Sequence, residues 1–169
     1  MQVLKEIQQW VSIKKFTDDK VDDKSLERIL EAGRRAPSAK NRQPWRFIVC
    51  RDEGLREKIK EASYGQEHVG QAPVIIAACT TNIEYRMPNG QLSYPVDISI
   101  AASFMLIQSR AEELGSCIVT TFDEDEVKDI LSIPYSMRVV MLLLIGHPAE
   151  TPMLNTRKSL ARIVGYDHW

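Results

Sequence analysis

Residues 34–49 have the sequence RRAPSAKNRQPWRFIV, a polar connector that leads directly into an apolar run. Pro37 cannot continue the hydrogen bonding of a helix, so the helical pattern before it should end there. The run RFIVC after Trp45 is typical of a short strand. Between Pro37 and Trp45 the connector holds five side chains that can donate hydrogen bonds. Turn chemistry alone does not need so many, so this connector is more than a plain turn.

Helix and strand patterns alternate on both sides of this connector. Apolar residues at helical spacing predict a first helix that ends near Ser12 or Ile13, and a second that starts within residues 22–24. Asp52 can cap a helix over GLREKIKEA. The run PVIIAAC, residues 73–79, is short and β-branched and predicts a buried strand.

The second half of the chain contains the longest helical segment. We expect Asp97 to cap its start and Gly115 to end it in a left-handed conformation after Leu114. No charged residue lies between Ile98 and Ser109. We therefore expect the helix to be buried on every side, both within the domain and against a second chain.

Two further strands and a helix precede an irregular tail. Residues 116–122 (SCIVTTF) and 138–148 (RVVMLLLIGHP) predict strands, and the second suits the middle of a sheet because it holds a continuous apolar run. The DEDE motif at 123–126 predicts a helix start. Residues 148–169 lose periodicity but keep apolar side chains, so we expect this tail to wrap a partner subunit. Residues 1–169 thus predict one domain, an α+β or α/β sandwich.

Composition limits the functions that the chain can have. Its 169 residues are 44% hydrophobic, which is enough for a core without disulfides. With 22 basic and 23 acidic residues, the chain has no net positive charge that would attract nucleic acid or an anionic membrane. No apolar run reaches membrane-spanning length, and the first residues lack the apolar region of a signal peptide. We expect a cytoplasmic protein with three free, buried thiols, Cys50, Cys79 and Cys117.

Several common catalytic patterns are missing from the sequence. The eight glycines form neither a GxGxxG motif nor a P-loop, there is no GxSxG elbow, and the three histidines lack partners at metal-ligand spacing. Hydroxyls do lie beside cations, a combination that can hold phosphate although each instance alone is more often a solvated surface. The three instances are Ser12 with Lys14 and Lys15, Arg34 and Arg35 before Ser38, and Thr156 to Ser159.

The connector resembles the signature of the FMN-dependent nitroreductase family, an Ala-Pro-Ser-x-x-Asn-x-Gln-Pro-Trp segment between the second helix and the first central strand. Other segments resemble the family in the expected order, namely SIKKF, YGQEHVGQAPVIIAAC, DISIAASFMLIQSRAEELGSC, FDEDEVKDILSIP, LLLIGHPAE and RKSLARIV. The resemblance implies a nitroreductase-like α+β sandwich whose central sheet is mixed but mostly antiparallel and flanked by helices. It also implies an intertwined homodimer with two FMN molecules, each contacted by both chains.

The resemblance also assigns residues to the FMN site. It implies a Lys14 cation near the flavin's pyrimidine edge, where positive charge stabilises the reduced, anionic flavin. It places Arg157 at the phosphate and the backbone N–H groups of Thr120 and Thr121 at N5. The implied cofactor-binding residues are Ser12, Lys14, Pro37, Ser38, Ala39, Asn41, Gln43, Gln66, Thr120, Thr121, Arg157 and Lys158. Residues 37–39 would come from the partner subunit.

The flavin itself would carry the chemistry, so no catalytic side chain and no metal are implied. We expect Pro37 and Pro44 to hold the connector in a rigid extended path that presents its polar groups to the flavin. Trp45 is expected to pack in the core, and Phe104 and Met105 at the dimer core.

The implied function is an FMN-dependent oxidoreductase that passes hydride from NADH or NADPH, through flavin N5, to a small acceptor such as a nitroaromatic or quinone by a ping-pong mechanism. Two alternatives stay open: a non-catalytic flavin-binding dimer, and a specialised reductive dehalogenase or flavin-modifying enzyme with another electron donor. Trp10 stands where the family commonly has an arginine; Lys15, Arg34 or Lys158 could replace that cation. The polar loop 82–95 is free to shape a substrate pocket.

Overall fold

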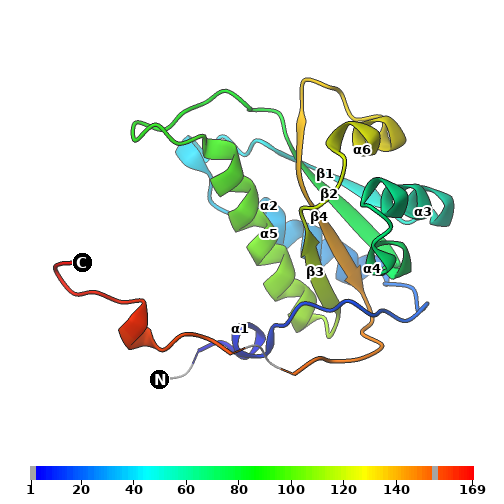
Figure 1. Cartoon of the computed structure of the whole chain (residues 1–169), viewed down its shortest axis with the longest axis horizontal. Helices are drawn as coiled ribbons and strands as arrows, with labels where there is room; N and C mark the ends of the chain where they lie inside the picture. The colour runs from blue at the N-terminus through cyan, green and yellow to red at the C-terminus, as the bar shows by residue number, and fades with distance from the viewer. Residues whose placement is uncertain (1–2, 154–155) are drawn as a thin grey trace.

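The computed structural model describes residues 3–153 and 156–169 (Figure 1). Its centre is a four-stranded sheet with the order β1-β2-β4-β3. Each pair of neighbouring strands is antiparallel. The strands are β1 (Trp45–Cys50), β2 (Val74–Thr80), β3 (Gly115–Val119) and β4 (Arg138–Gly146). As predicted, the continuous apolar run of β4 lies inside the sheet, where both of its faces are covered.

Helices cover both faces of this sheet, which confirms the predicted α+β sandwich. In Figure 1, α2 and α5 lie on one side of the sheet and α3, α4 and α6 on the other. The helices are α1 (Lys5–Gln9), α2 (Asp23–Arg34), α3 (Glu53–Ala62), α4 (Glu67–Gln71), α5 (Ser93–Ala111) and α6 (Glu124–Leu131). Two short 3-10 turns, η1 (Ala39–Asn41) and η2 (Leu160–Arg162), lie in the connector and the tail. Within the described residues, no helix has both the length and the apolar character needed to cross a bilayer.

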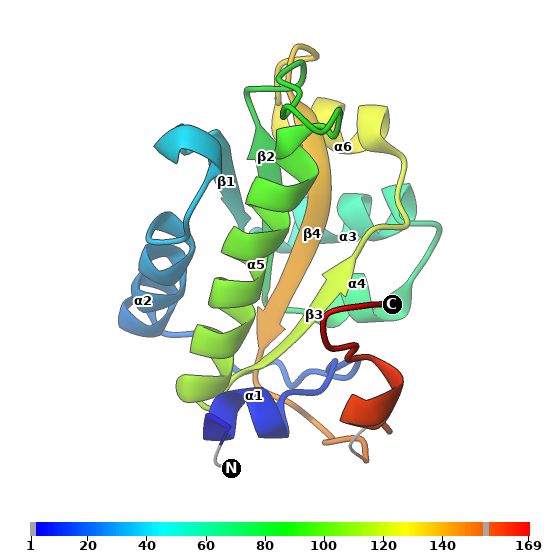
Figure 2. The same ribbon diagram turned by 90° about the vertical axis from the view of Figure 1, so that its left-hand side faces the viewer.

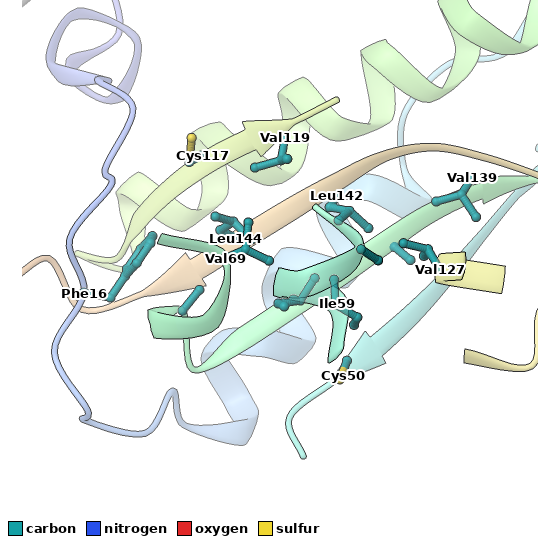
Figure 3. Packing of buried hydrophobic residues seen from close by; sticks show 14 of the residues in the cluster. Phe16, Cys50, Ile59, Val69, Cys117, Val119, Val127, Val139, Leu142 and Leu144 are labelled. Atoms are coloured by element: carbon teal, nitrogen blue, oxygen red, sulfur yellow. The ribbon is translucent and has the colours of Figure 1, made fainter. Parts of the chain in front are cut away.

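The hydrophobic core has two halves because successive side chains of a strand point to opposite faces of a sheet. Ile75 and Ala77 of β2 pack with the layer of α3, α4 and α6. Val74 and Ile76 pack with the layer of α2 and α5, where Trp45 is also buried as predicted. Figure 3 shows the first half, in which helical side chains lie over β4. All three cysteines are buried and free, as expected.

Local signals placed three helix starts correctly. Asp22, Asp52 and Asp123 each accept hydrogen bonds from backbone N–H groups in the first turn of the helix that follows. These bonds satisfy donors that a helix start otherwise leaves without partners. The caps therefore fix where α2, α3 and α6 begin.

Two predicted helix boundaries are wrong. The first helix ends at Gln9 rather than near Ser12 or Ile13, because the Ile13 N–H donates to Ser116 O at 3.0 Å and the segment runs extended along β3. The longest helix begins at Ser93, so Asp97 lies inside α5 and does not cap it.

The end of α5 also differs from the prediction. The left-handed residue is Glu113, with φ 60°, while Gly115 already belongs to β3. A side chain at Gly115 would collide with Ile13, whose Cγ1 lies 2.7 Å from the position of an added Cβ. This glycine is needed because another segment passes close to its backbone.

Helix α5 is not buried on every side within one chain. Met105 is fully buried, but Val96 and Phe104 are 41% and 40% exposed, and Ile100 between them is half-buried. Residues four apart lie on one face of a helix, so these three form an apolar stripe along α5. The expectation of a second chain against this helix is untested and stays a prediction.

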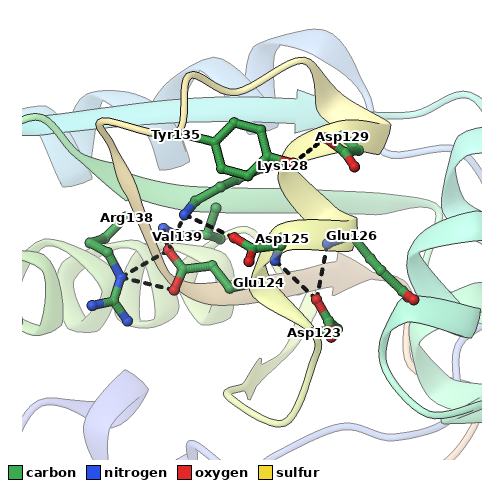
Figure 4. Close-up of polar contacts among 9 residues, drawn as sticks. All are labelled: Asp123, Glu124, Asp125, Glu126, Lys128, Asp129, Tyr135, Arg138 and Val139. Carbon is green, nitrogen blue, oxygen red and sulfur yellow. Dashed lines mark hydrogen bonds and ion pairs between the residues drawn. The ribbon is translucent and has the colours of Figure 1, made fainter.

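A polar network holds α6 against β4 (Figure 4). The Lys128 ammonium, on a side chain only 6% exposed, lies 3.1 Å from Glu124 Oε1. The same carboxylate accepts hydrogen bonds from Arg138 Nε at 2.8 Å and from the Val139 N–H at 2.9 Å. A buried lysine needs such partners because an isolated charge would be costly there. The network thereby joins the first turn of α6 to the start of β4.

The tail leaves the body of the molecule. In Figure 1 the segment around η2 lies apart from the sheet and its helices. Every described residue from position 149 onward is exposed, including Ile163 and Trp169. The structure therefore agrees that this tail has nothing local to bury its apolar groups. Its contact with a partner subunit stays a prediction.

Candidate functional site

One group of predicted site residues gathers where residues 10–17, here called the strap, cross β3. Ser12 forms an isolated bridge with Ser116. The exposed Lys14 lies near two groups that the sequence did not single out for the site. Burial raises the pKa of the Cys117 thiol, and the Lys14 charge and the Ser12 hydroxyl oppose that rise. Burial lowers the pKa of His68, and the Lys14 charge lowers it further.

Gln66 joins this group through the turn after β3. Its Nε2 donates to Thr121 O and to Ser63 O, both at 2.8 Å. Thr120 and Thr121 are exposed, and their N–H groups have no hydrogen-bond acceptor within the described residues. The strap, Gln66 and this turn thus offer a hydroxyl, a cation and backbone donors in one region.

A second group lies in residues 37–44, here called the connector loop. The Ala39 N–H donates to Asp97 Oδ1 at 2.8 Å, and the Gln43 N–H donates to Ser38 Oγ at 2.9 Å. Gln43 Nε2 donates to Asn41 Oδ1 at 3.1 Å. These bonds fold the loop on itself. The predicted rigid extended path is therefore wrong, because a proline fixes only its own φ and restrains the residue before it.

The backbone of the connector loop is strained. Lys40, Asn41 and Gln43 have φ of 54°, 53° and 51°, in the left-handed region that side chains disfavour. Each such residue costs on the order of 1–3 kcal/mol, and strain of this kind clusters at ligand-binding sites. Asp97 supports the loop from α5, and this carboxylate is only 2% exposed. Its Oδ2 has no hydrogen-bond partner within the described chain.

One chain does not bring the two groups together. The connector loop is tied through Asp97 to the first half of α5. The strap starts beside the last turns of α5, where Arg110 Nη2 donates to Oε1 of Gln9, the residue just before the strap, at 3.1 Å. Figure 2 shows this separation: the cyan turn η1 lies near the start of α5, and the blue N-terminal segment near its end. A ligand that contacts both groups would need the connector loop of another chain.

The cations expected at the phosphate lie on the tail, outside both groups. Arg157 and Lys158 are exposed on the tail. Of the candidate replacements for the missing arginine, Lys15 forms an ion pair with Glu150 at 2.9 Å, and Arg34 Nε lies 2.6 Å from a carboxylate oxygen of Glu31. Both are engaged within the chain.

Trp10, at the position of the missing arginine, has a structural contact. Its indole Nε1 donates to Ser116 Oγ at 3.2 Å, which ties the strap to β3. A tryptophan offers one N–H donor and no charge, so it cannot take the place of a phosphate-binding guanidinium.

Comparison with known proteins identifies the family. The sequence model of the nitroreductase family matches residues 7–67 and 62–147, which covers most of the chain. The chain belongs to the nitroreductase family. It is 33% identical to a putative NADH dehydrogenase/NAD(P)H nitroreductase of Methanothermobacter thermautotrophicus, over 90% of this chain and 80% of that protein.

Solved nitroreductase structures share the fold. A nitroreductase family protein from Clostridium difficile is 28% identical, with a TM-score of 0.87 over 100% of both chains. The chain is also 28% identical to the FMN reductase [NAD(P)H] of Bacillus subtilis, over 88% of this chain and 67% of that protein. The sequence-based prediction of family and fold is confirmed by these matches.

Proposed function

We propose that this nitroreductase family member is an FMN-dependent oxidoreductase that takes hydride from NADH or NADPH and reduces a small electrophilic acceptor, such as a nitroaromatic or a quinone. Membership of the family supports an oxidoreductase. Similarity to a protein named FMN reductase [NAD(P)H] supports the cofactor and the hydride donor.

The observation that carries the proposal is the split site. The strap and the connector loop lie at opposite ends of α5, and the stripe of Val96, Ile100 and Phe104 is exposed between them. In a two-fold dimer the same surface of each chain packs on itself. Two copies of α5 crossing in opposite directions would bury both stripes and bring each connector loop toward the partner's strap. Each homodimer would then hold two composite sites.

The donor set of the two groups suits FMN. A flavin has a planar apolar ring system with a polar edge and carries a phosphate. Ser12 and Lys14 would contact one part of its polar edge. The Thr120 and Thr121 N–H groups offer donors that no acceptor within the described residues uses. Arg157 and Lys158 of the tail would supply positive charge for the phosphate. The connector loop, with the partner's Ser38 and Asn41 among its groups, would close the other side.

When bound, the flavin would supply hydride transfer between donor and acceptor. The chain's own task would be to bind and orient the reactants. Lys14 would also favour negative charge at the nearby ring edge, which raises the reduction potential of the cofactor. No side-chain acid or base is required, because solvent can supply protons.

A specialised reaction is the second candidate. The chain is 27% identical to a 5,6-dimethylbenzimidazole synthase of Rhodobacter capsulatus and 25% identical to an iodotyrosine deiodinase of Nematostella vectensis. Those names show that similar chains carry different chemistry. A non-catalytic flavin-binding dimer is the third candidate. Reduction by nicotinamide separates it from the NAD(P)H-dependent enzyme.

The decisive experiment is the visible spectrum of the purified protein, followed by anaerobic addition of NADH and then NADPH. We expect a yellow protein, or one that becomes yellow with added FMN, whose flavin is bleached by at least one nicotinamide and recovers when a quinone is added. Light scattering on the same sample should give the mass of a dimer. A protein that binds no FMN would refute the proposal. Bound flavin that stays oxidised with both nicotinamides would favour the non-catalytic dimer or an enzyme with another electron donor.

A further inference from the structure

Two loops bring two cations against the ring of one tyrosine, and a third cation follows that tyrosine in the chain. The Arg42 guanidinium carbon lies 3.7 Å from the centre of the Tyr85 ring, and Lys40 Nζ lies 5.5 Å from it. Arg86 follows Tyr85 and donates from Nη1 to Gly90 O at 3.0 Å. We call Lys40, Arg42, Tyr85 and Arg86 the basic cluster. Stacking on an aromatic face restrains the cations and holds the two loops together.

The cations of this cluster have no acidic partner. Within the described residues, none of Lys40, Arg42 and Arg86 forms an ion pair with a carboxylate. Arginines elsewhere on the body commonly do, and the pairs are Arg28 with Glu112, Arg34 and Arg35 with Glu31, Arg51 with Asp23, and Arg138 with Glu124. The positive charge of the cluster is therefore available to a ligand.

The acids near the cluster do not cancel its charge. Glu84 is exposed and precedes Tyr85 in the loop, and no ion pair joins it to the three cations. Asp97 is buried and accepts the Ala39 N–H, so it faces the backbone of the connector loop. Three cations against these two acids leave a net positive charge. An exposed field of this kind attracts anions over roughly the Debye length of about 8–10 Å.

The position of the cluster suggests what it binds. Lys40 and Arg42 lie in the connector loop, next to the groups proposed to close over the flavin, and Lys40 is held at φ 54°. Tyr85 and Arg86 lie in loop 82–92, which a bridge between Arg86 and Leu92 shapes. A reactant that approaches the flavin would pass this pair of loops.

We propose that the basic cluster binds an anionic group, a phosphate, carboxylate or sulfonate, on a small molecule that exchanges hydride at the flavin. The inference rests on the proposed function and adds a class of substrate to it. The anion could belong to the nicotinamide dinucleotide, through its phosphates, or to the electron acceptor. Both sources carry negatively charged oxygens, which the Arg42 guanidinium and the Lys40 ammonium can bind.

The test compares paired substrates that differ in their anionic groups. For the donor, kcat/KM is measured with NADH and with 1-benzyl-1,4-dihydronicotinamide, a neutral hydride donor without phosphate. For the acceptor, it is measured with 1,4-naphthoquinone-2-sulfonate and with unsubstituted 1,4-naphthoquinone. The variants of the FMN-loaded protein are Lys40→Gln/Arg42→Gln and the charge-preserving Arg42→Lys. Lys58→Gln is the matched control, because Lys58 is exposed on α3 at the opposite face of the sheet.

The readout is the ratio of kcat/KM for the anionic substrate to that for the neutral one. We expect the double variant to lower this ratio about fivefold to tenfold in one arm, as the loss of two exposed charge contacts would. Arg42→Lys should lower the anionic-to-neutral ratio less than the double variant does, and Lys58→Gln should leave it within about twofold of the wild-type value. The arm that responds identifies whether the donor or the acceptor carries the anion.

Other outcomes overturn the inference. Ratios within about twofold of the wild-type values in both arms would refute the anion site. A parallel fall with anionic and neutral substrates would mean that the stacked cations only hold the loops together. A wild-type protein whose bound flavin no donor reduces would refute the proposed function instead, and this inference with it.

Discussion

Asp97→Ala tests whether one buried carboxylate sets the shape of the connector loop. The Ala39 N–H donates to Asp97 Oδ1 at 2.8 Å, and this bond links α5 to a loop with three left-handed residues. A hydrogen bond to a charged group contributes about 1.5–3 kcal/mol. If the loop must adopt this shape to bind FMN, losing the bond should weaken binding by roughly 10-fold to 100-fold, since about 1.4 kcal/mol is tenfold.

The same structure predicts only a small change in global stability. The carboxylate is buried, and its Oδ2 has no partner within the described residues, so its charge is already costly to the fold. We expect the free energy of unfolding of the apo variant to change by no more than about 1–2 kcal/mol. Asp97→Asn keeps an oxygen that can accept the Ala39 N–H. It should therefore retain FMN affinity within about fivefold.

The assay is fluorescence titration of the apo protein with FMN, alongside urea unfolding without cofactor. Asp18→Ala serves as the control, because Asp18 is an exposed carboxylate outside the connector loop and the strap. Wild-type affinity in Asp97→Ala would refute the reasoning. An equal loss in Asp97→Ala and Asp97→Asn would show that the charge, and not the hydrogen bond, is what matters.

Two further changes test the scaffold. Arg28 lowers the pKa of Glu112 to about 2, so this carboxylate stabilises the fold above pH of about 4.5 and the benefit is lost as pH falls toward 2. Glu112→Gln should lower the free energy of unfolding by about 1–2 kcal/mol at pH 7, and urea unfolding should show the difference between wild type and variant narrowing below pH 4.5. A difference that does not depend on pH would contradict a role for the Glu112 charge. A methyl group at Gly146 would lie 2.5 Å from Pro73 Cδ and 2.9 Å from Phe16 Cδ1. Gly146→Ala should cost about 1–3 kcal/mol in unfolding experiments, and an unchanged stability would show that these rings move aside.

Local physics explains which parts of the fold could be predicted. Asp52 and Asp123 cap helices through bonds to residues two or three positions away, so the sequence alone contains both partners. The strands β2 and β4 each contain a continuous apolar run, which is typical of strands whose two faces are both covered. Helix ends that depend on distant segments were missed, as at Gln9, where the strap turns to pair with β3.

The candidate site divides in the same way. The connector loop was found from its crowded donors, but its folded shape was not, because the Asp97 carboxylate that supports Ala39 lies 58 positions away in the chain. The placement of Cys117 and His68 near Lys14 likewise has no local signal in the sequence. Contacts of this kind form only when strands and helices from different parts of the chain pack together.

The sequence by itself determined the family, the order of helices and strands, and the polar groups offered to a ligand, because these follow from residue types and their spacing. Only the tertiary structure decided where those groups lie: the strap at one end of α5 and the connector loop at the other, with an apolar stripe exposed between them. Spacing along a chain does not fix distance in space. The packing of α5 across the sheet does, and within one chain it keeps the strap and the connector loop at opposite ends of that helix.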